Sequence, residues 1–157
     1  MLKKWFIVDA HQHIRVGTYI YASQIPRETE EEQLKREITY FKEWFERYGV
    51  AYGAVSNISP MVDRVWKSRH GGNEAVAELV KHLNGKVIGQ YVPNVFEPPD
   101  IVKEKTEEAI RDLGFKGIKM HPWVSAFPLN HPMVYPVLDV AAKYRICLLY
   151  TSPSPRD

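Results

Sequence analysis

The sequence predicts an α/β protein in which strands and helices alternate along the chain. Short apolar runs typical of strands are separated by segments whose apolar residues repeat every three or four positions, as on one face of a helix. The order β-α-β-α-β-α-β-α-β favours a parallel sheet with helices packed outside it. A complete (β/α)8 TIM barrel needs about 250 residues, and the chain has 157. We therefore expect the N-terminal half of such a barrel, about four βα units plus the start of strand five.

The composition is that of an ordinary globular domain. The chain is 45% hydrophobic and 25% charged, with a net charge of +2. No cluster of Lys and Arg points to nucleic acid, and no apolar run approaches the roughly 20 residues that span a bilayer. We expect neither a nucleic-acid nor a membrane partner. The single cysteine fits a reducing compartment, the cytoplasm.

The first predicted strand ends in a pair of histidines. Trp5 to Val8 form an apolar run that predicts a buried strand, and His11 and His13 follow it. Side chains alternate along an extended chain, so the two imidazoles point to the same side. Neutral imidazoles are good ligands for zinc-like ions, and we interpret the pair as part of a metal site. The alternative is two unrelated polar residues that leave a strand.

The remaining boundaries follow from caps, glycines and apolar repeats. Thr29 and Glu32 form a capping box, and an apolar helical repeat from Leu34 to Tyr48 ends at Gly49. The later elements are predicted in the same way: strands over 51–56, 87–92 and 115–120, helices capped by Asn73, by Asp100 and by Asn130 or His131, and a fifth strand from Arg145.

Two loops follow strands and would lie near the histidines. Ile14 to Arg27 is either a solvent-exposed connector or a lid that contacts substrate. The loop from Asn57 to Gly72 carries cations that could meet an anionic substrate, although a solvated surface loop accounts for them more simply. These cations are Arg64, Lys67, Arg69 and His70.

The end of the chain differs in character from the rest. Cys147 to Asp157 resembles the translation of a sequencing adapter, so we expect a partial barrel over 1–146 and a non-native tail over 147–157. A natural flexible end rich in Ser and Pro is the alternative. Half a barrel leaves two open sheet edges, which predicts dimerisation or aggregation.

Two motifs resemble signatures of one enzyme superfamily. Asp9-Ala10-His11-Gln12-His13 is similar to the Asp-x-His-x-His motif of the amidohydrolase superfamily. The segment from Gly114 to Pro122 resembles the Gly-Phe-x-Gly-Ile-Lys-x-His-Pro motif of its amidohydrolase-related branch. That branch includes aminocarboxymuconate-semialdehyde decarboxylase and resorcylate-type decarboxylases, besides true hydrolases. The resemblance covers residues 1 to about 146.

The resemblance implies a metal-dependent barrel with its site at the C-terminal ends of the strands. His11 and His13 match the strand-one ligands of one divalent ion, which we expect to be zinc. His121 matches a strand-end histidine and is the implied catalytic residue, or else it caps its strand. Lys119 faces the interior, where it would bind substrate, pair with a carboxylate or, as in some members, be carboxylated and bridge two metals. Trp123 would wall the substrate pocket or merely pack.

Other ligands that the resemblance implies have no counterpart. The strand-five histidine would fall where Leu148, Leu149 and Tyr150 stand, and the strand-six histidine and strand-eight aspartate are not in the sequence. We therefore expect this fragment neither to hold metal tightly nor to turn over substrate. For the parent protein, the resemblance implies hydrolysis or non-oxidative decarboxylation of a small carbonyl or carboxylate substrate through a metal-activated water, with a homo-oligomer left open. The rival is a non-catalytic α/β small-molecule binding domain with structural histidines.

Overall fold

The computed structural model describes residues 5–14, 16, 28–57, 68–83 and 85–150, along which strands and helices alternate as predicted. The strands are β1 (Ile7–Ile14), β2 (Val50–Asn57), β3 (Val87–Tyr91), β4 (Gly117–Met120) and β5 (Cys147–Tyr150). The helices are α1 (Glu30–Tyr48), α3 (Asn73–His82), α4 (Pro99–Arg111), α5 (Pro122–Ser125) and α6 (Tyr135–Tyr144), with a 3-10 turn, η2 (Pro132–Val134), before α6.

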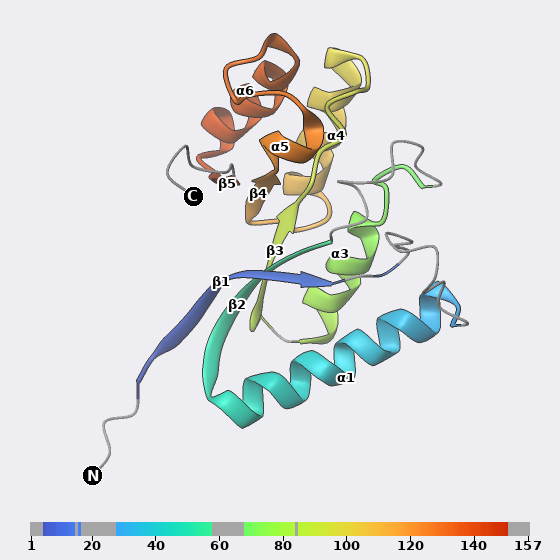
Figure 1. The fold of residues 1–157 in the computed structure, drawn as a ribbon, viewed down its shortest axis with the longest axis vertical. Helices are drawn as coiled ribbons and strands as arrows, with labels where there is room; N and C mark the ends of the chain where they lie inside the picture. Colours follow the sequence, from blue (N-terminus) through green and yellow to red (C-terminus); the bar gives the residue numbers. More distant parts are fainter. Residues whose placement is uncertain (1–4, 15, 17–27, 58–67, 84, 151–157) are drawn as a thin grey trace.

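The described strands form one curled parallel sheet in the order β1-β2-β3-β4-β5. Helices α1 and α3 pack beside β2 and β3, while α4 and α6 pack against each other farther along the sheet (Figure 1). This arrangement is the N-terminal half of a TIM barrel, so the predicted fold class is confirmed. Strands β1 and β5 are the two edges of the sheet.

The two faces of the sheet can be told apart by what lies next to its glycines. A Cβ atom at Gly89 would lie 3.1 Å from Val80 on α3 and 3.2 Å from Phe115, so Gly89 faces outward and allows close packing there. A Cβ atom at Gly117 would instead meet the side chain of Gln90. Because side chains alternate along a strand, Lys119 shares the inner face with Gly117.

Helix α1 begins and ends where the sequence predicts. Thr29 Oγ1 accepts a hydrogen bond from the Glu32 backbone N–H at 3.2 Å, and the Glu32 carboxylate accepts one from the Thr29 N–H at 2.7 Å. Gly49 ends the helix with a left-handed φ of 62°. Phe41 is fully buried, whereas Tyr48, predicted on the same face, is the last residue of the helix and is exposed.

Two predicted helix caps are wrong. Gly72, not Asn73, occupies the cap of α3. The Asn73 amide nitrogen donates to the carbonyls of His70 (2.6 Å) and Val92 (2.9 Å), and its oxygen accepts from the Val92 N–H. The side chain therefore joins the start of α3 to the end of β3, a tertiary role that overrides its local capping preference. Asp100 lies inside the first turn of α4, because that helix already begins at the preceding proline.

The last predicted elements are present with shifted boundaries. His131 Nδ1 accepts from the Met133 N–H at 3.3 Å and caps η2, as one of the two alternatives predicts. The fifth strand starts at Cys147 rather than Arg145, because Arg145 adopts a left-handed φ of 53° that ends α6. Of the expected tail, 147–150 pair with β4, and 151–157 lie outside the described residues.

The apolar run before the histidines is not buried, contrary to the prediction. Trp5 and Phe6 are each 76% exposed, and Ile7 and Val8 are 41% and 48% exposed. The reason is topological: β1 pairs with β2 alone among the described strands. A parallel sheet normally buries both faces, and the two edge strands depart from this, since Tyr150 on β5 is also 54% exposed.

The core lies between the outer face of the sheet and the helices, and includes Phe41, Leu79, Tyr91, Phe115 and Ile118. No helix in the described part of the chain is both long and apolar enough to cross a membrane. Of the two predicted loops, 17–27 lie outside the described residues, as do Arg64 and Lys67.

Candidate metal and substrate site

The two predicted metal ligands come together on β1. His11 Nε2 and His13 Nε2 lie 2.9 Å apart, with the ring centroids 4.7 Å apart. Two nitrogen ligands of one tetrahedral zinc ion, each about 2.0–2.1 Å from it, are separated by about 3.3 Å. The two atoms therefore need to move by only a few tenths of an ångström to share one ion. The pair fits two positions of a metal site.

The backbone that carries the histidines is irregular. Asp9 pairs with Gly53 and Gln12 pairs with Val55, so β1 accommodates one more residue than β2 over this span, as in a β-bulge. The Asp9 carboxylate accepts hydrogen bonds from the His11 backbone N–H (3.0 Å) and from the Gln12 amide (2.7 Å). The acid of the Asp-x-His-x-His motif thus stabilises the bulged backbone next to His11.

Ser56 orients His13 and was missed by the sequence reasoning. Its hydroxyl lies 2.9 Å from His13 Nδ1, and it is fully buried as the register partner of His13 on β2. When Nδ1 donates to this hydroxyl, Nε2 keeps its lone pair for a metal. The signal that could have found Ser56 is its position near the C-terminal end of the next strand.

Burial and neighbouring cations favour neutral imidazoles. Burial, followed by the charges of His11 and Lys119, lowers the pKa of His13 to about 4. Burial and Lys119 also lower the pKa of His11, against a smaller raising effect of Asp9. Neutral imidazole is the form that binds a metal, so both rings are available as ligands at pH 7.

Lys119 and His121 reach the same interior from β4. Lys119 is fully buried, and burial lowers its pKa. His121 directly follows the strand, and burial and then Lys119 lower its pKa. The charges of both residues act on His13, so the ends of β1 and β4 face one shared space. The structure thus brings four of the five predicted site residues together.

The described residues do not supply a complete set of metal ligands. They contain no group of three or more His, Cys, Asp or Glu side chains that could hold an ion. Leu149 on β5 is the register partner of Lys119 and offers no ligand atom. Trp123, the fifth predicted site residue, lies in α5, and its side chain is outside the described part of the structure. The residues present fit half of a metal site.

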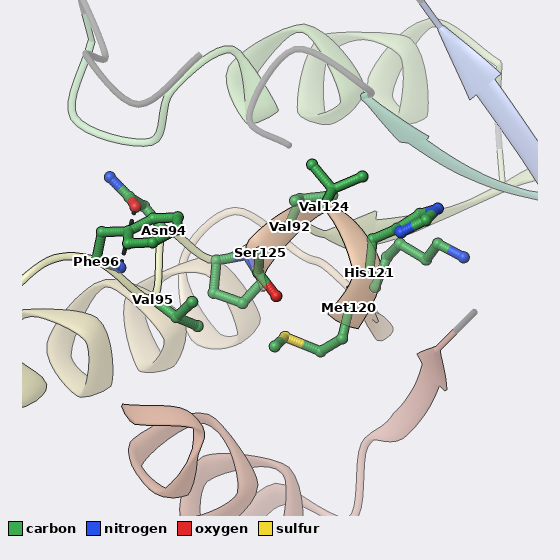
Figure 2. A pocket seen from close by; sticks show the side chains of 10 residues that line it. Val92, Asn94, Val95, Phe96, Met120, His121, Val124 and Ser125 are labelled. Carbon is green, nitrogen blue, oxygen red and sulfur yellow. Dashed lines mark hydrogen bonds between the residues drawn. The ribbon is translucent and has the colours of Figure 1, made fainter. Parts of the chain in front are cut away.

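A pocket lies where β3 and β4 end (Figure 2). Its lining includes apolar Val95, Met120 and Val124 as well as Lys119 and His121. Figure 2 shows Met120 and His121 leaving the end of β4 in different directions. Apolar walls beside a buried amine suit a small carboxylate with an apolar body.

Two of the predicted loop cations serve the scaffold. Arg69 donates hydrogen bonds to Glu108 (2.7 Å) and Glu104 (2.5 Å) on α4. His70 is buried, with Nδ1 3.4 Å from the Tyr91 hydroxyl and Nε2 3.6 Å from a Glu108 carboxylate oxygen. A solvated loop thus describes Arg69 but not His70. Neither residue lines the pocket, and both attach the loop before α3 to α4 and β3.

Solved structures share this fold. A protein of Staphylococcus aureus that is assigned as an amidohydrolase superposes with a TM-score of 0.70 at 17% identity, over 96% of this chain and 48% of its own. A 2,6-dihydroxybenzoate decarboxylase from Rhizobium gives 0.67 at 15% identity, over 97% and 52%. A 5-carboxyvanillate decarboxylase from Novosphingobium aromaticivorans, solved with bound manganese, gives 0.69 at 14% identity, over 93% and 51%.

At these identities the likeness establishes the fold. No protein-family model matches the chain, and no curated protein matches it. The chain spans about half the length of the solved structures it matches. Its structural neighbours are enzymes of the amidohydrolase family, and the chain has the architecture of their N-terminal barrel half.

Proposed function

We propose that this chain is the N-terminal half of the catalytic barrel of a metal-dependent hydrolase or non-oxidative decarboxylase. The observation that carries the proposal is the convergence of the His11 and His13 Nε2 atoms, 2.9 Å apart, in a space that also takes in Lys119. The neighbours' chemistry supports it, since a decarboxylase of this fold was solved with manganese.

Each residue has a distinct role in this proposal. His11 and His13 hold one divalent ion, zinc or manganese, and Ser56 fixes the His13 ring. A divalent metal, when bound, lowers the pKa of its water to about 7 and polarises a substrate carbonyl. Lys119 binds the substrate carboxylate, and His121 exchanges a proton with the substrate, because its lowered pKa leaves the ring neutral and able to accept one.

The substrate class follows from the pocket. A small acid with a planar or apolar body would place its carboxylate at the Lys119 ammonium and its body against Val95 and Val124. Tight metal binding and turnover require the further ligands of a whole barrel, so we assign two of the metal ligands and the acid-binding lysine to this chain and catalysis to the complete enzyme.

Binding of a small aromatic acid tests the substrate assignment. We expect 2,6-dihydroxybenzoate to bind the chain, as measured by chemical-shift titration, and Lys119→Met to weaken the binding at least tenfold because the ammonium is lost. Lys116→Met, at an exposed lysine just before β4, is the matched control. Equal affinity in the wild type and Lys119→Met would remove Lys119 from the binding role.

A non-catalytic small-molecule binding domain is the second candidate. It is favoured by the fact that the described residues offer no group of three metal-ligating side chains. The two candidates differ in their response to metal. The catalytic proposal expects Mn²⁺ to tighten 2,6-dihydroxybenzoate binding in the wild type and not in His13→Ala, whereas the binding domain predicts the same affinity with and without Mn²⁺.

A further inference from the structure

Three aromatic rings join the two sides of the pocket. We call Phe96, Phe127 and His131 the ring cluster. The centroids of Phe96 and Phe127 lie 5.4 Å apart with an angle of 46° between the rings, and Phe127 stacks on His131 at 4.4 Å and 23°. Phe96 lines the pocket from the segment after β3, whereas Phe127 follows Val124 and Ser125, which line it from α5. The ring cluster therefore bridges two segments that are distant in the sequence.

The segment that carries Phe96 is anchored at both ends. At its start, the N–H and the carbonyl of Val92 both bond to the Asn73 side chain, each at 2.9 Å. At its end, the Lys105 ammonium donates a hydrogen bond to the Glu97 carboxylate at 2.6 Å. Because Asn73 belongs to α3 and Lys105 to α4, two helices of the scaffold fix the backbone on either side of Phe96.

Phe127 is held from the other side of the pocket. Ala126, directly before it, has a left-handed φ of 59°, which a residue with a side chain adopts only where its surroundings impose it. This turn ends α5, and Phe127 then lies against His131. The His131 ring is fixed in turn, because its Nδ1 accepts a hydrogen bond from the Met133 N–H at 3.3 Å. The contact between Phe96 and Phe127 thus sets the distance between the two sides of the pocket.

The ring cluster lies at the far end of the pocket from the proposed acid-binding lysine. Figure 2 shows Phe96 and His121 at opposite ends of the pocket, and Lys119 lies two residues before His121 on β4. An acid whose carboxylate meets the Lys119 ammonium therefore directs the far end of its body toward Phe96. The longer that body is, the closer it comes to the ring cluster.

We infer that Phe127 is a positioning residue that, acting through Phe96, limits the length of the acid that the pocket accepts; this rests on the proposed function of Lys119. Contacts between aromatic rings stabilise a structure beyond the area that they bury. A bound acid that displaces Phe96 loses that stabilisation, so the ring cluster disfavours acids with two rings in line. Removal of the Phe127 ring leaves Phe96 without its support and should relieve this discrimination.

Affinities for two acids of different length test the role of Phe127. Chemical-shift titration gives the dissociation constants of 2,6-dihydroxybenzoate and of biphenyl-4-carboxylate, and their ratio is the readout. In Phe127→Ala the ratio is expected to shift toward the longer acid by about threefold or more, the size of one aromatic contact. Phe127→Tyr keeps the ring and should keep the wild-type ratio. Tyr135→Ala, at an aromatic residue on α6 that is 50% exposed, is the matched control.

Further results separate the role of Phe127 from that of Lys119. A wild type that binds neither acid, or that binds both as tightly as Lys119→Met does, overturns the proposed function and the role of Phe127 together. If the wild type binds through Lys119 but Phe127→Ala keeps the wild-type ratio, the role of Phe127 alone is overturned, as it is if Phe127→Tyr shifts the ratio equally. Thermal melts show whether Phe127→Ala is folded; if it is not, Phe127→Leu, which keeps an apolar side chain without the ring, replaces it.

Discussion

Two histidine sites in this fold differ in what their imidazoles contact. His11 and His13 lie on an edge strand, and their Nε2 atoms point to one another at 2.9 Å. His70 is buried outside the sheet, between the Tyr91 hydroxyl and the Glu108 carboxylate. Both sites contain an acid and a hydroxyl, but only the β1 pair brings two imidazole Nε2 atoms together, 2.9 Å apart.

The difference lies in what the acid and the hydroxyl of each site contact. The His70 ring has an acidic partner on α4 and a hydroxyl partner on β3, which fix a loop to the scaffold. The carboxylate next to His11 is instead occupied by backbone and amide donors, and the imidazole nitrogens remain directed toward each other. We therefore assign a stabilising role to His70 and propose a ligand-binding role for His11 and His13.

The largest effect on stability is expected at the buried histidine. His70→Ala should lower the free energy of unfolding by about 2–3 kcal/mol, because it opens a cavity and removes the partner of the Tyr91 hydroxyl. Urea denaturation measures this difference, with His82→Ala at an exposed position of α3 as control. A loss of unfolding free energy no larger than that of His82→Ala would mean that the contacts of His70 with Tyr91 and Glu108 do not stabilise the fold.

The pH response of His13 gives a second, smaller test. In metal-free protein its NMR titration midpoint is expected near pH 4, and Lys119→Met should raise it because one repelling charge is lost. Since the folded pKa lies below the ordinary value of 6.5, the unfolded chain takes up the proton first. Stability should therefore fall as pH drops from about 6.5 toward 4. A midpoint near 6.5 in both proteins would show that the ring is solvated and apart from Lys119.

The smallest effect is expected at Glu108. Hydrogen bonds from Arg69 are the main cause of its lowered pKa, so its contribution is present above pH 4.5 and is lost as pH falls through the folded pKa. Glu108→Gln should lower the melting temperature at pH 7 by less than His70→Ala, because Arg69 is half exposed. The gap to the wild type should close as the pH of the melts falls through the folded pKa, whereas Glu46→Gln, at an exposed position of α1, serves as the control. A gap that persists at acid pH would assign the effect to packing.

Local sequence patterns correctly predicted those features of the structure that are set by residues close together in the chain. The period of two along a strand brought His11 and His13 together, and the reciprocal capping of Thr29 and Glu32 fixed the start of α1. The predictions were wrong or incomplete where the partner of a side chain comes from a segment that is distant in the sequence. Asn73 bonds to β3 instead of capping its own helix, and Ser56 is visible as a partner of His13 only once the register of β1 and β2 is known.

The burial of the first strand failed for the same reason. An apolar run such as Trp5 to Val8 indicates that a strand prefers burial, but the covering element must come from elsewhere in the fold or from another molecule. The described strands place it at an open edge. The sequence therefore predicted the strand correctly and its burial wrongly, because burial depends on the topology around the strand.

Metal titration of the purified chain by calorimetry tests the central claim most directly. We expect weak binding of Mn²⁺ or Zn²⁺ through His11 and His13, two ligands of an incomplete set, with the heat of binding lost in His11→Ala and in His13→Ala and kept in His70→Ala. Binding that survives both β1 substitutions, or that disappears only in His70→Ala, would contradict the account and make the β1 histidines structural.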